Sequence, residues 1–165
     1  MLPRSYTAIF LALLIAIQAL TLMNGCAPDT RYLREGHRYA DAGDWDKAVT
    51  FFQKANEDNP GDTEISLMLR RSKFKASQMH LERGRVYLQQ GLFTEAMKEF
   101  QISMALNPAN MPASELFAEA QDKRDARHYY KQGRNFLKIK KHDQALEAFK
   151  KAIELDPAFE PAGKA

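Results

Sequence analysis

The chain repeats one stretch of eighteen residues three times. The first copy reads GDWDKAVTFFQKANEDNP from Gly43 to Pro60, the second GLFTEAMKEFQISMALNP from Gly91 to Pro108, and the third KKHDQALEAFKKAIELDP from Lys140 to Pro157. The copies follow one another after 48 and then 49 residues. Repetition at such a period predicts an array of like units, each of which buries its apolar face against a neighbour.

The resemblance between the copies extends upstream of these stretches. Each copy holds glycine, an aromatic residue, alanine, phenylalanine and proline at offsets of 0, 3, 12, 16 and 24 residues. These positions are Gly36, Tyr39, Ala48, Phe52 and Pro60 in the first copy, Gly84, Tyr87, Ala96, Phe100 and Pro108 in the second, and Gly133, Phe136, Ala145, Phe149 and Pro157 in the third. The pattern resembles the tetratricopeptide repeat, a helix–turn–helix unit of about 34 residues. The resemblance implies an all-α solenoid.

The repeated residues have physical roles in such a unit. The glycine lies in the first helix, where a side chain would hold the second helix away, and the alanine is its small partner on that second helix. The aromatic residues fill the space between the helix pairs. The proline ends the second helix, because the residue before proline is disfavoured in helical geometry. We also expect Asp44, Thr94 and Asp143 to cap the second helices, and the third turn, with Lys140 and Lys141, to be weaker.

The spacing of the copies is longer than the unit itself. We therefore expect an array over residues 31–159 with three units at about 29–62, 77–110 and 126–159, two extra segments at 63–76 and 111–125, and a tail at 160–165. The extra segments are rich in helix-forming residues. We predict that each continues into the first helix of the next unit, giving two elongated helices from about Thr63 to Gln90 and from about Ala113 to Ile139. A separate short helix with a kink is the alternative.

The N-terminal residues differ from the rest. Arg4 precedes an apolar run at residues 7–23, and Gly25–Cys26 follows. This order resembles a bacterial lipoprotein signal, which implies a signal peptide at 1–25, lipidation of Cys26, a lipidated linker at 26–30 and an anchor in the membrane. Ala27 after the cysteine implies the outer membrane, facing the periplasm. The alternatives are an uncleaved anchor in the inner membrane and a plain cleaved signal peptide.

Composition argues against several classes of function. The net charge is only +3, which gives no basic surface for nucleic acid. The single cysteine excludes an internal disulfide. The four histidines have no ligand spacing and no obvious acid beside them, and no phosphate loop or nucleophile motif is present. We therefore expect no enzyme activity, no metal and no cofactor.

Protein binding is the expected function. In the resembled family, first helices line a concave groove that holds a partner's peptide or helix. The groove candidates are His37 in the first unit, Leu81, Arg85 and Leu88 in the second, and Tyr130, Arg134 and Leu137 in the third. Arg85 and Arg134 occupy equivalent positions and are suited to bind a carboxylate of the partner. The alternative, which the sequence favours, is that both are solvated surface residues.

The last helix and the N-terminal segment suggest where the partner acts. We expect no further polar helix to cover all of the face of the last helix that carries Ala145, Phe149 and Ala152. Either the long helix folds over it, the protein self-associates, or a partner or a further C-terminal domain covers it, and we favour the last. A lipid anchor joined to a repeat array resembles pilotin-type and assembly lipoproteins of the outer membrane, and the repeat segment of secretin-associated proteins. The resemblance implies a scaffold that assists a secretion or type IV pilus secretin in the cell envelope. A periplasmic module that binds peptides or cell-wall fragments is the alternative.

Overall fold

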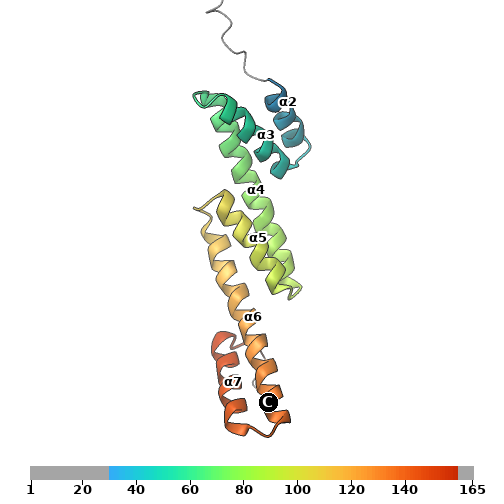
Figure 1. Ribbon diagram of the computed structural model, residues 1–165, viewed down its shortest axis with the longest axis vertical. Helices are drawn as coiled ribbons and strands as arrows, with labels where there is room; N and C mark the ends of the chain where they lie inside the picture. Colours follow the sequence, from blue (N-terminus) through green and yellow to red (C-terminus); the bar gives the residue numbers. More distant parts are fainter. Residues whose placement is uncertain (1–29, 160–165) are drawn as a thin grey trace, which may run out of the picture. The chain divides into compact units, whose positions relative to one another are not determined.

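The protein is described by a computed structural model over residues 30–159. These residues form six α-helices and no strand, which confirms the all-α prediction (Figure 1). The helices are α2 (Thr30–Asp41), α3 (Trp45–Asp58), α4 (Thr63–Gln89), α5 (Phe93–Leu106), α6 (Met111–Lys138) and α7 (His142–Leu155). The predicted signal peptide, the Cys26 lipidation site and the tail at 160–165 lie outside the described residues.

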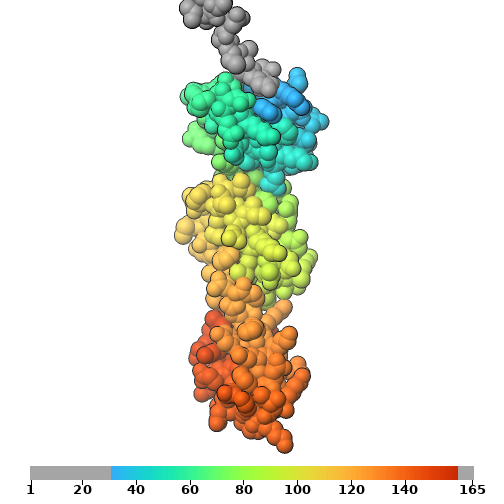
Figure 2. All heavy atoms as spheres, in the orientation of Figure 1, coloured from blue at the N-terminus to red at the C-terminus, as the bar shows by residue number. Residues whose placement is uncertain are grey.

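The chain divides into two compact units, and the division falls between Leu69 and Arg70. In the first unit α2 packs on α3, and in the second α6 packs on both α5 and α7. Figure 2 shows the atoms of α5 and of the first half of α6 in close contact. The division lies inside α4, and the part of α4 from Arg70 onward belongs to the second unit.

The two elongated helices are present. α4 has 27 residues and α6 has 28, and each extra segment runs into the following first helix without a break. A rise of 1.5 Å per residue makes each about 40 Å long. α6 starts after Asn110, whose side chain accepts a hydrogen bond from the N–H of Ala113 at 3.4 Å, and Pro112 suits its first turn. The continuous-helix prediction is therefore confirmed.

The repeated glycines set the distance between paired helices. A Cβ atom built on any of them would lie 2.5 to 2.7 Å from a phenylalanine ring of the second helix. The pairs are Gly36 with Phe52, Gly84 with Phe100, and Gly133 with Phe149. Real Cβ atoms do not approach ring carbons so closely. The glycine prediction holds, but the partner that fills the space is the phenylalanine rather than the repeated alanine, which is itself buried.

The three turns inside the pairs share one backbone conformation. Gly43, Gly91 and Lys140 have φ of 75°, 73° and 58°. Glycine adopts this left-handed region freely, whereas a lysine in it is strained. The third turn is the strained one, as the sequence predicted.

The ends of the second helices agree only partly with prediction. α3, α5 and α7 end two residues before Pro60, Pro108 and Pro157, as expected. The Asp44 side chain caps α3 and accepts from the N–H of Lys47 at 3.3 Å. The other two caps were predicted wrongly, because Leu92 and Lys141 occupy the cap positions of α5 and α7 without a side-chain hydrogen bond. Thr94 and Asp143 lie inside the first turns instead.

The last helix is covered differently from what the sequence predicted. Ala145, Phe149 and Ala152 are buried against α6, so the alternative in which the long helix covers this face is confirmed, and the favoured cover by a partner or a further domain is wrong. The apolar residues of α7 that remain exposed are Leu146 and Ile153, at 56% and 39%. The exposed apolar face of α7 is therefore the one that does not contact α6.

Candidate partner-binding site

The groove candidate of the first unit is a surface residue of α2. His37 is exposed, and its ring meets the Phe52 ring edge-on with 5.3 Å between centroids. The contact fixes one edge of the imidazole and leaves the side chain accessible.

The candidates on α4 are only partly available. Leu81 is 3% exposed and belongs to the core of the second unit, so its assignment to a partner groove is wrong. Leu88 is partly buried against the same core. Arg85 is exposed, and its Nη1 lies 2.8 Å from Oε1 of Glu82, one turn before it. An exposed ion pair of this kind stabilises weakly, which leaves Arg85 able to exchange partners.

The candidates on α6 lie along one face of the helix. Tyr130 packs against Phe149 and Phe159, with centroids 5.6 and 5.4 Å apart. The guanidinium of Arg134 lies 6.0 Å from the centre of the Tyr130 ring. Leu137 follows one turn later and is exposed. The structure thus brings these three together, while a groove that joins them to His37 stays a prediction.

One histidine has an acid partner that the sequence did not reveal. His80 is buried, and its Nδ1 lies 2.6 Å from Oε2 of Glu99 on α5. Nη1 of Arg83 lies 3.5 Å from the same oxygen. The interpretation that no histidine has an acid beside it is wrong, because α4 and α5 bring together residues nineteen positions apart.

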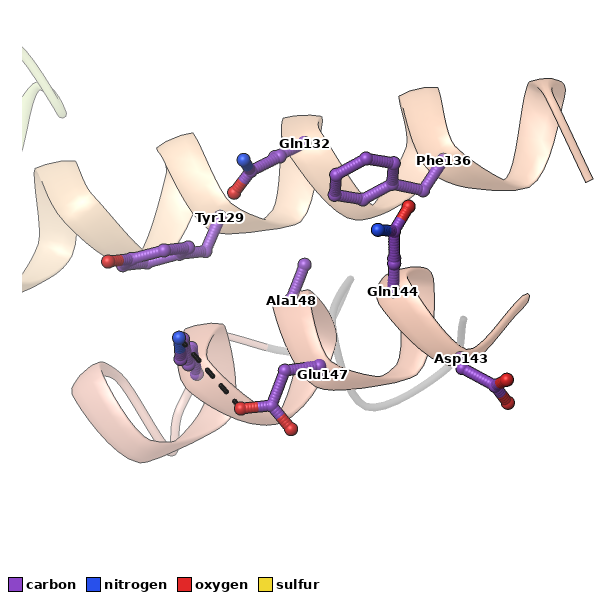
Figure 3. A pocket seen from close by; sticks show the side chains of 8 residues that line it. Tyr129, Gln132, Phe136, Asp143, Gln144, Glu147 and Ala148 are labelled. Carbon is purple, nitrogen blue, oxygen red and sulfur yellow. Dashed lines mark ion pairs between the residues drawn. The ribbon is translucent and has the colours of Figure 1, made fainter. Parts of the chain in front are cut away.

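The hairpin of α6 and α7 carries an open hollow of about 340 Å³ (Figure 3). We call it the α6–α7 slot. Its lining includes Tyr129, Gln132 and Phe136 from α6 and Asp143, Glu147 and Ala148 from α7. Figure 3 shows Ala148 pointing toward α6 between the two aromatic rings. An aromatic wall at each end and a methyl group at the floor make a site for an apolar side chain.

The rim of the slot is charged. Lys151 lies with its Nζ 5.7 Å from the Tyr129 ring centre and 3.8 Å from Oε1 of Glu147. Asp143 is exposed and forms no ion pair within residues 30–159. The repeat pattern gave Phe136 only a packing role, and neither Tyr129 nor the slot was predicted from the sequence. The signal was Ala148, which stands where the first copy has Phe51.

Two other kinds of site are absent from the described part of the chain. Between residues 30 and 159, no three histidine, cysteine or acidic side chains gather closely enough to bind a metal ion. None of the helices in that range combines the length and the hydropathy required to cross a membrane.

Comparison with known families decides the architecture. Two models of the tetratricopeptide repeat match the chain, one over residues 33–110 and one over residues 126–159. The chain is a tetratricopeptide repeat protein. Repeats of this family are generally non-enzymatic modules that bind proteins, so this tetratricopeptide repeat protein is a protein–protein interaction scaffold.

Solved structures with some similarity to this tetratricopeptide repeat protein include two crystal structures of the protein MamA. One is 24% identical and covers 81% of this chain and 75% of that chain, with a TM-score of 0.25. The other is 23% identical and covers 77% of each chain, with a TM-score of 0.22. At these values neither bears on function. A comparison with curated protein sequences found no match.

Proposed function

We propose that this tetratricopeptide repeat protein holds a protein partner at the outer membrane of a bacterial envelope and assists assembly of a complex such as a secretion or pilus secretin. The observation that carries the binding part is the hairpin of α6 and α7. It presents the Tyr130–Arg134–Leu137 face on one side and the α6–α7 slot on the other. Its half-buried aromatic side chains and its exposed arginine are residue types that dominate protein interfaces.

The two sides of α6 follow from helix geometry. At about 100° per residue, Tyr129 and Phe136 project to one side of the line through Gly133, and Arg134 and Leu137 project to the other. Gly133 contacts Phe149 of α7, so that line is the contact between the two helices. A partner segment can therefore bind along either side without displacing α7.

The membrane part of the proposal is supported by the N-terminal sequence alone. A charged start, an apolar run and Gly25–Cys26 precede the described residues. More than one acyl chain on Cys26 would anchor the protein stably, whereas a single chain anchors only marginally. Metabolic labelling with a fatty-acid probe tests this step, and the Cys26→Ser variant should lose the label.

An affinity pull-down from detergent-solubilised envelopes tests the whole proposal. We expect the full-length protein to recover a secretin or another envelope component, and the Cys26→Ser variant to recover less of it. Recovery of the same partner in equal amount by both forms would remove the tether from the proposal. Recovery of no protein by either form would remove the scaffold and favour self-association or the capture of small periplasmic ligands.

The groove arginines are tested in the same pull-down. Arg85→Glu combined with Arg134→Glu should abolish capture of the partner while the helical circular dichroism is unchanged. The matched control is Arg70→Glu combined with Arg71→Glu, which makes the same charge change at exposed positions of α4. Equal capture by both double variants would remove the arginines from the site.

A further inference from the structure

One position of the second helix is filled differently in each of the three helix pairs. It lies three residues after the buried repeated alanine, and it holds Phe51 in α3, Glu99 in α5 and Ala148 in α7. The three pairs share the same glycine–phenylalanine contact, so the position lies at the same place in each pair. Phe51 and Glu99 fill the space at this position, whereas Ala148 does not.

In the first pair the position is filled by an aromatic ring. The Phe51 ring stacks on Tyr39, with centroids 5.2 Å apart and planes inclined by 14°, and lies 6.4 Å from Tyr32. Nζ of Lys54 is 5.9 Å from the Phe51 ring centre and 5.5 Å from that of Tyr32. Two aromatic residues seven positions apart on the first helix thus hold a third ring between them, with a lysine beside it.

In the second pair the position is filled by a charge. Glu99 accepts from buried His80 and from Arg83. His80 stands where the first pair has Tyr32, and Arg83 where it has Glu35. The space is again occupied, now by an ion cluster within the fold.

In the third pair the walls are those of the first pair, and the ring is missing. Tyr129 and Phe136 correspond to Tyr32 and Tyr39, and Lys151 corresponds to Lys54 and lies 5.7 Å from the Tyr129 ring centre. Ala148 offers only a methyl group, and the hollow of about 340 Å³ lies above it (Figure 3). We propose that the α6–α7 slot binds an aromatic side chain of a protein partner, which takes the place that Phe51 holds in the first pair.

The rim adds a second requirement on the partner. The lining holds two carboxylates, Asp143 and Glu147, and one ammonium, Lys151; Glu147 pairs with Lys151, and the Asp143 carboxylate forms no ion pair with any described residue. A basic residue next to the aromatic one would complement this charge. Ring stacking contributes beyond the area it buries, and Lys151 adds a cation–π contact. The inference rests on the proposed partner-binding function and names the chemistry of the partner's anchor.

The test is an NMR titration of the full-length protein in detergent micelles with the dipeptide N-acetyl-Phe-Lys-amide. We expect the Ala148 methyl resonance to shift through the ring current, with a Kd on the order of millimolar, as befits a ligand of this size. N-acetyl-Leu-Lys-amide should give a much smaller shift, and N-acetyl-Phe-Glu-amide should bind more weakly. An Ala148 methyl unmoved by the Phe-Lys probe at about 10 mM, ten times the expected Kd, would overturn the proposal.

A variant taken from the protein's own first repeat gives the sharpest control. In Ala148→Phe the introduced ring should occupy the slot, leave Tm unchanged or raised, and weaken probe binding at least tenfold, measured from the Gln132 amide. The matched control is Ala105→Phe, the same change at an exposed position of α5, which should bind as the parent does. Undiminished binding by Ala148→Phe would contradict the slot.

Two further comparisons keep the outcomes separate. If Ala148→Phe does not fold, Tyr129→Leu removes one aromatic wall and should also weaken the probe at least severalfold, and unchanged binding would count against the slot. A pull-down that recovers a partner equally with parent and Ala148→Phe overturns the slot and leaves the scaffold. Probe binding without any recovered partner supports the slot and counts against the tethered scaffold.

Discussion

The second helix pair, α4–α5, and the third, α6–α7, have the same glycine–phenylalanine contact but differ in what covers them. The first half of α6 lies over α5, and Met97 and Met104 pack there beside Leu116 and Phe117. On α7 the same two positions are Leu146 and Ile153, and both are exposed. An extra segment of fifteen residues therefore makes the difference between a covered pair and an open one.

The two pairs also close their ends with different chemistry. In the covered pair the Asn110 side-chain amide donates to Ser77 Oγ at 2.9 Å and to Ser103 Oγ at 3.0 Å, and the two serines bond each other's carbonyl oxygens. The residues 49 positions later are Ala126, Ala152 and Phe159. A buried polar network that is fully satisfied fixes three segments relative to one another. The open pair has no following helix among the described residues and uses apolar contacts instead.

The largest effect is expected from the central phenylalanines. Phe100→Ala should cost about 3–5 kcal/mol of unfolding free energy, because the ring is fully buried and the cavity is enclosed on all sides. Phe149→Ala should fall at the low end of that range, since the Phe149 ring is 6% exposed at the uncovered pair. Urea denaturation followed by circular dichroism measures both. A larger loss for Phe149→Ala would contradict the view that the third pair is the open one.

Matched polar substitutions on α5 and α7 test whether α6 covers the first of these helices and leaves the second open. Met97→Gln with Met104→Gln should lower the unfolding free energy by about 2–4 kcal/mol, because both side chains pack in the core of the second unit. Leu146→Gln with Ile153→Gln should change it by less than about 1 kcal/mol in total, because exposed positions tolerate substitution. Sedimentation of the second variant is the control. A parent that is dimeric and a variant that is monomeric would show that another copy covers α7.

The effect of Asn110→Ser on stability should change sign when the two serines of the polar network are also replaced. Asn110→Ser keeps a good cap for α6 but removes both amide donors, so alone it should destabilise by about 1 kcal/mol. Ser77→Ala with Ser103→Ala leaves the Asn110 amide buried without acceptors, at about 1–3 kcal/mol. Added to that double variant, Asn110→Ser should raise stability. Thermal denaturation of the four proteins measures the coupling, and simple additivity would argue against a shared network.

The repeat pattern predicted the fold because its rules are local and short in range. Gly36, Gly84 and Gly133 leave room for one ring each, and proline two residues after a helix ends it, so both the pairing and the helix ends could be read from spacing. The elongated helices were predictable for the same reason, since the extra segments contain nothing that ends a helix before the next turn.

The candidate site was predicted less well, because it depends on contacts between distant segments. Leu81 was placed in a groove as if the repeats were stacked in the usual way, but Ala113 and Ala120 of the extra segment of α6 belong to the cluster that buries it. The α6–α7 slot depends on a side chain that Ala148 lacks, at a position that the repeat pattern does not specify. Only the comparison with Phe51 shows the lack.

One substitution in the turn between α6 and α7 should stabilise the protein. Lys140→Gly should raise the unfolding free energy by about 0.5–1 kcal/mol, because the residue has φ of 58° and glycine relieves the left-handed strain at some cost in unfolded-state entropy. The matched control is Lys138→Gly, inside the last turn of α6, which should destabilise by about 1 kcal/mol. Both are measured by urea denaturation. A loss from Lys140→Gly would mean that the turn is not strained in solution.

The smallest expected effect is a pH dependence due to Asp44 at the start of α3, which has a side-chain cap, that is absent at the start of α7, which has none. A hydrogen bond from the Lys47 side chain lowers the pKa of Asp44 below its ordinary value of 3.8. The stabilisation is therefore present above that value and is lost as pH falls through the lower pKa of the folded state. An NMR titration should show the Lys47 amide moving with a midpoint below pH 3.8, and Asp44→Asn, which keeps an acceptor but no titrating group, should show no such step. Because the pair is exposed, about 1 M NaCl should move the midpoint upward. The amides at the start of α7, where Lys141 supplies no side-chain cap, should titrate alike in the parent and in Asp44→Asn. A change at both helices caused by Asp44→Asn would mean that the cap does not act locally.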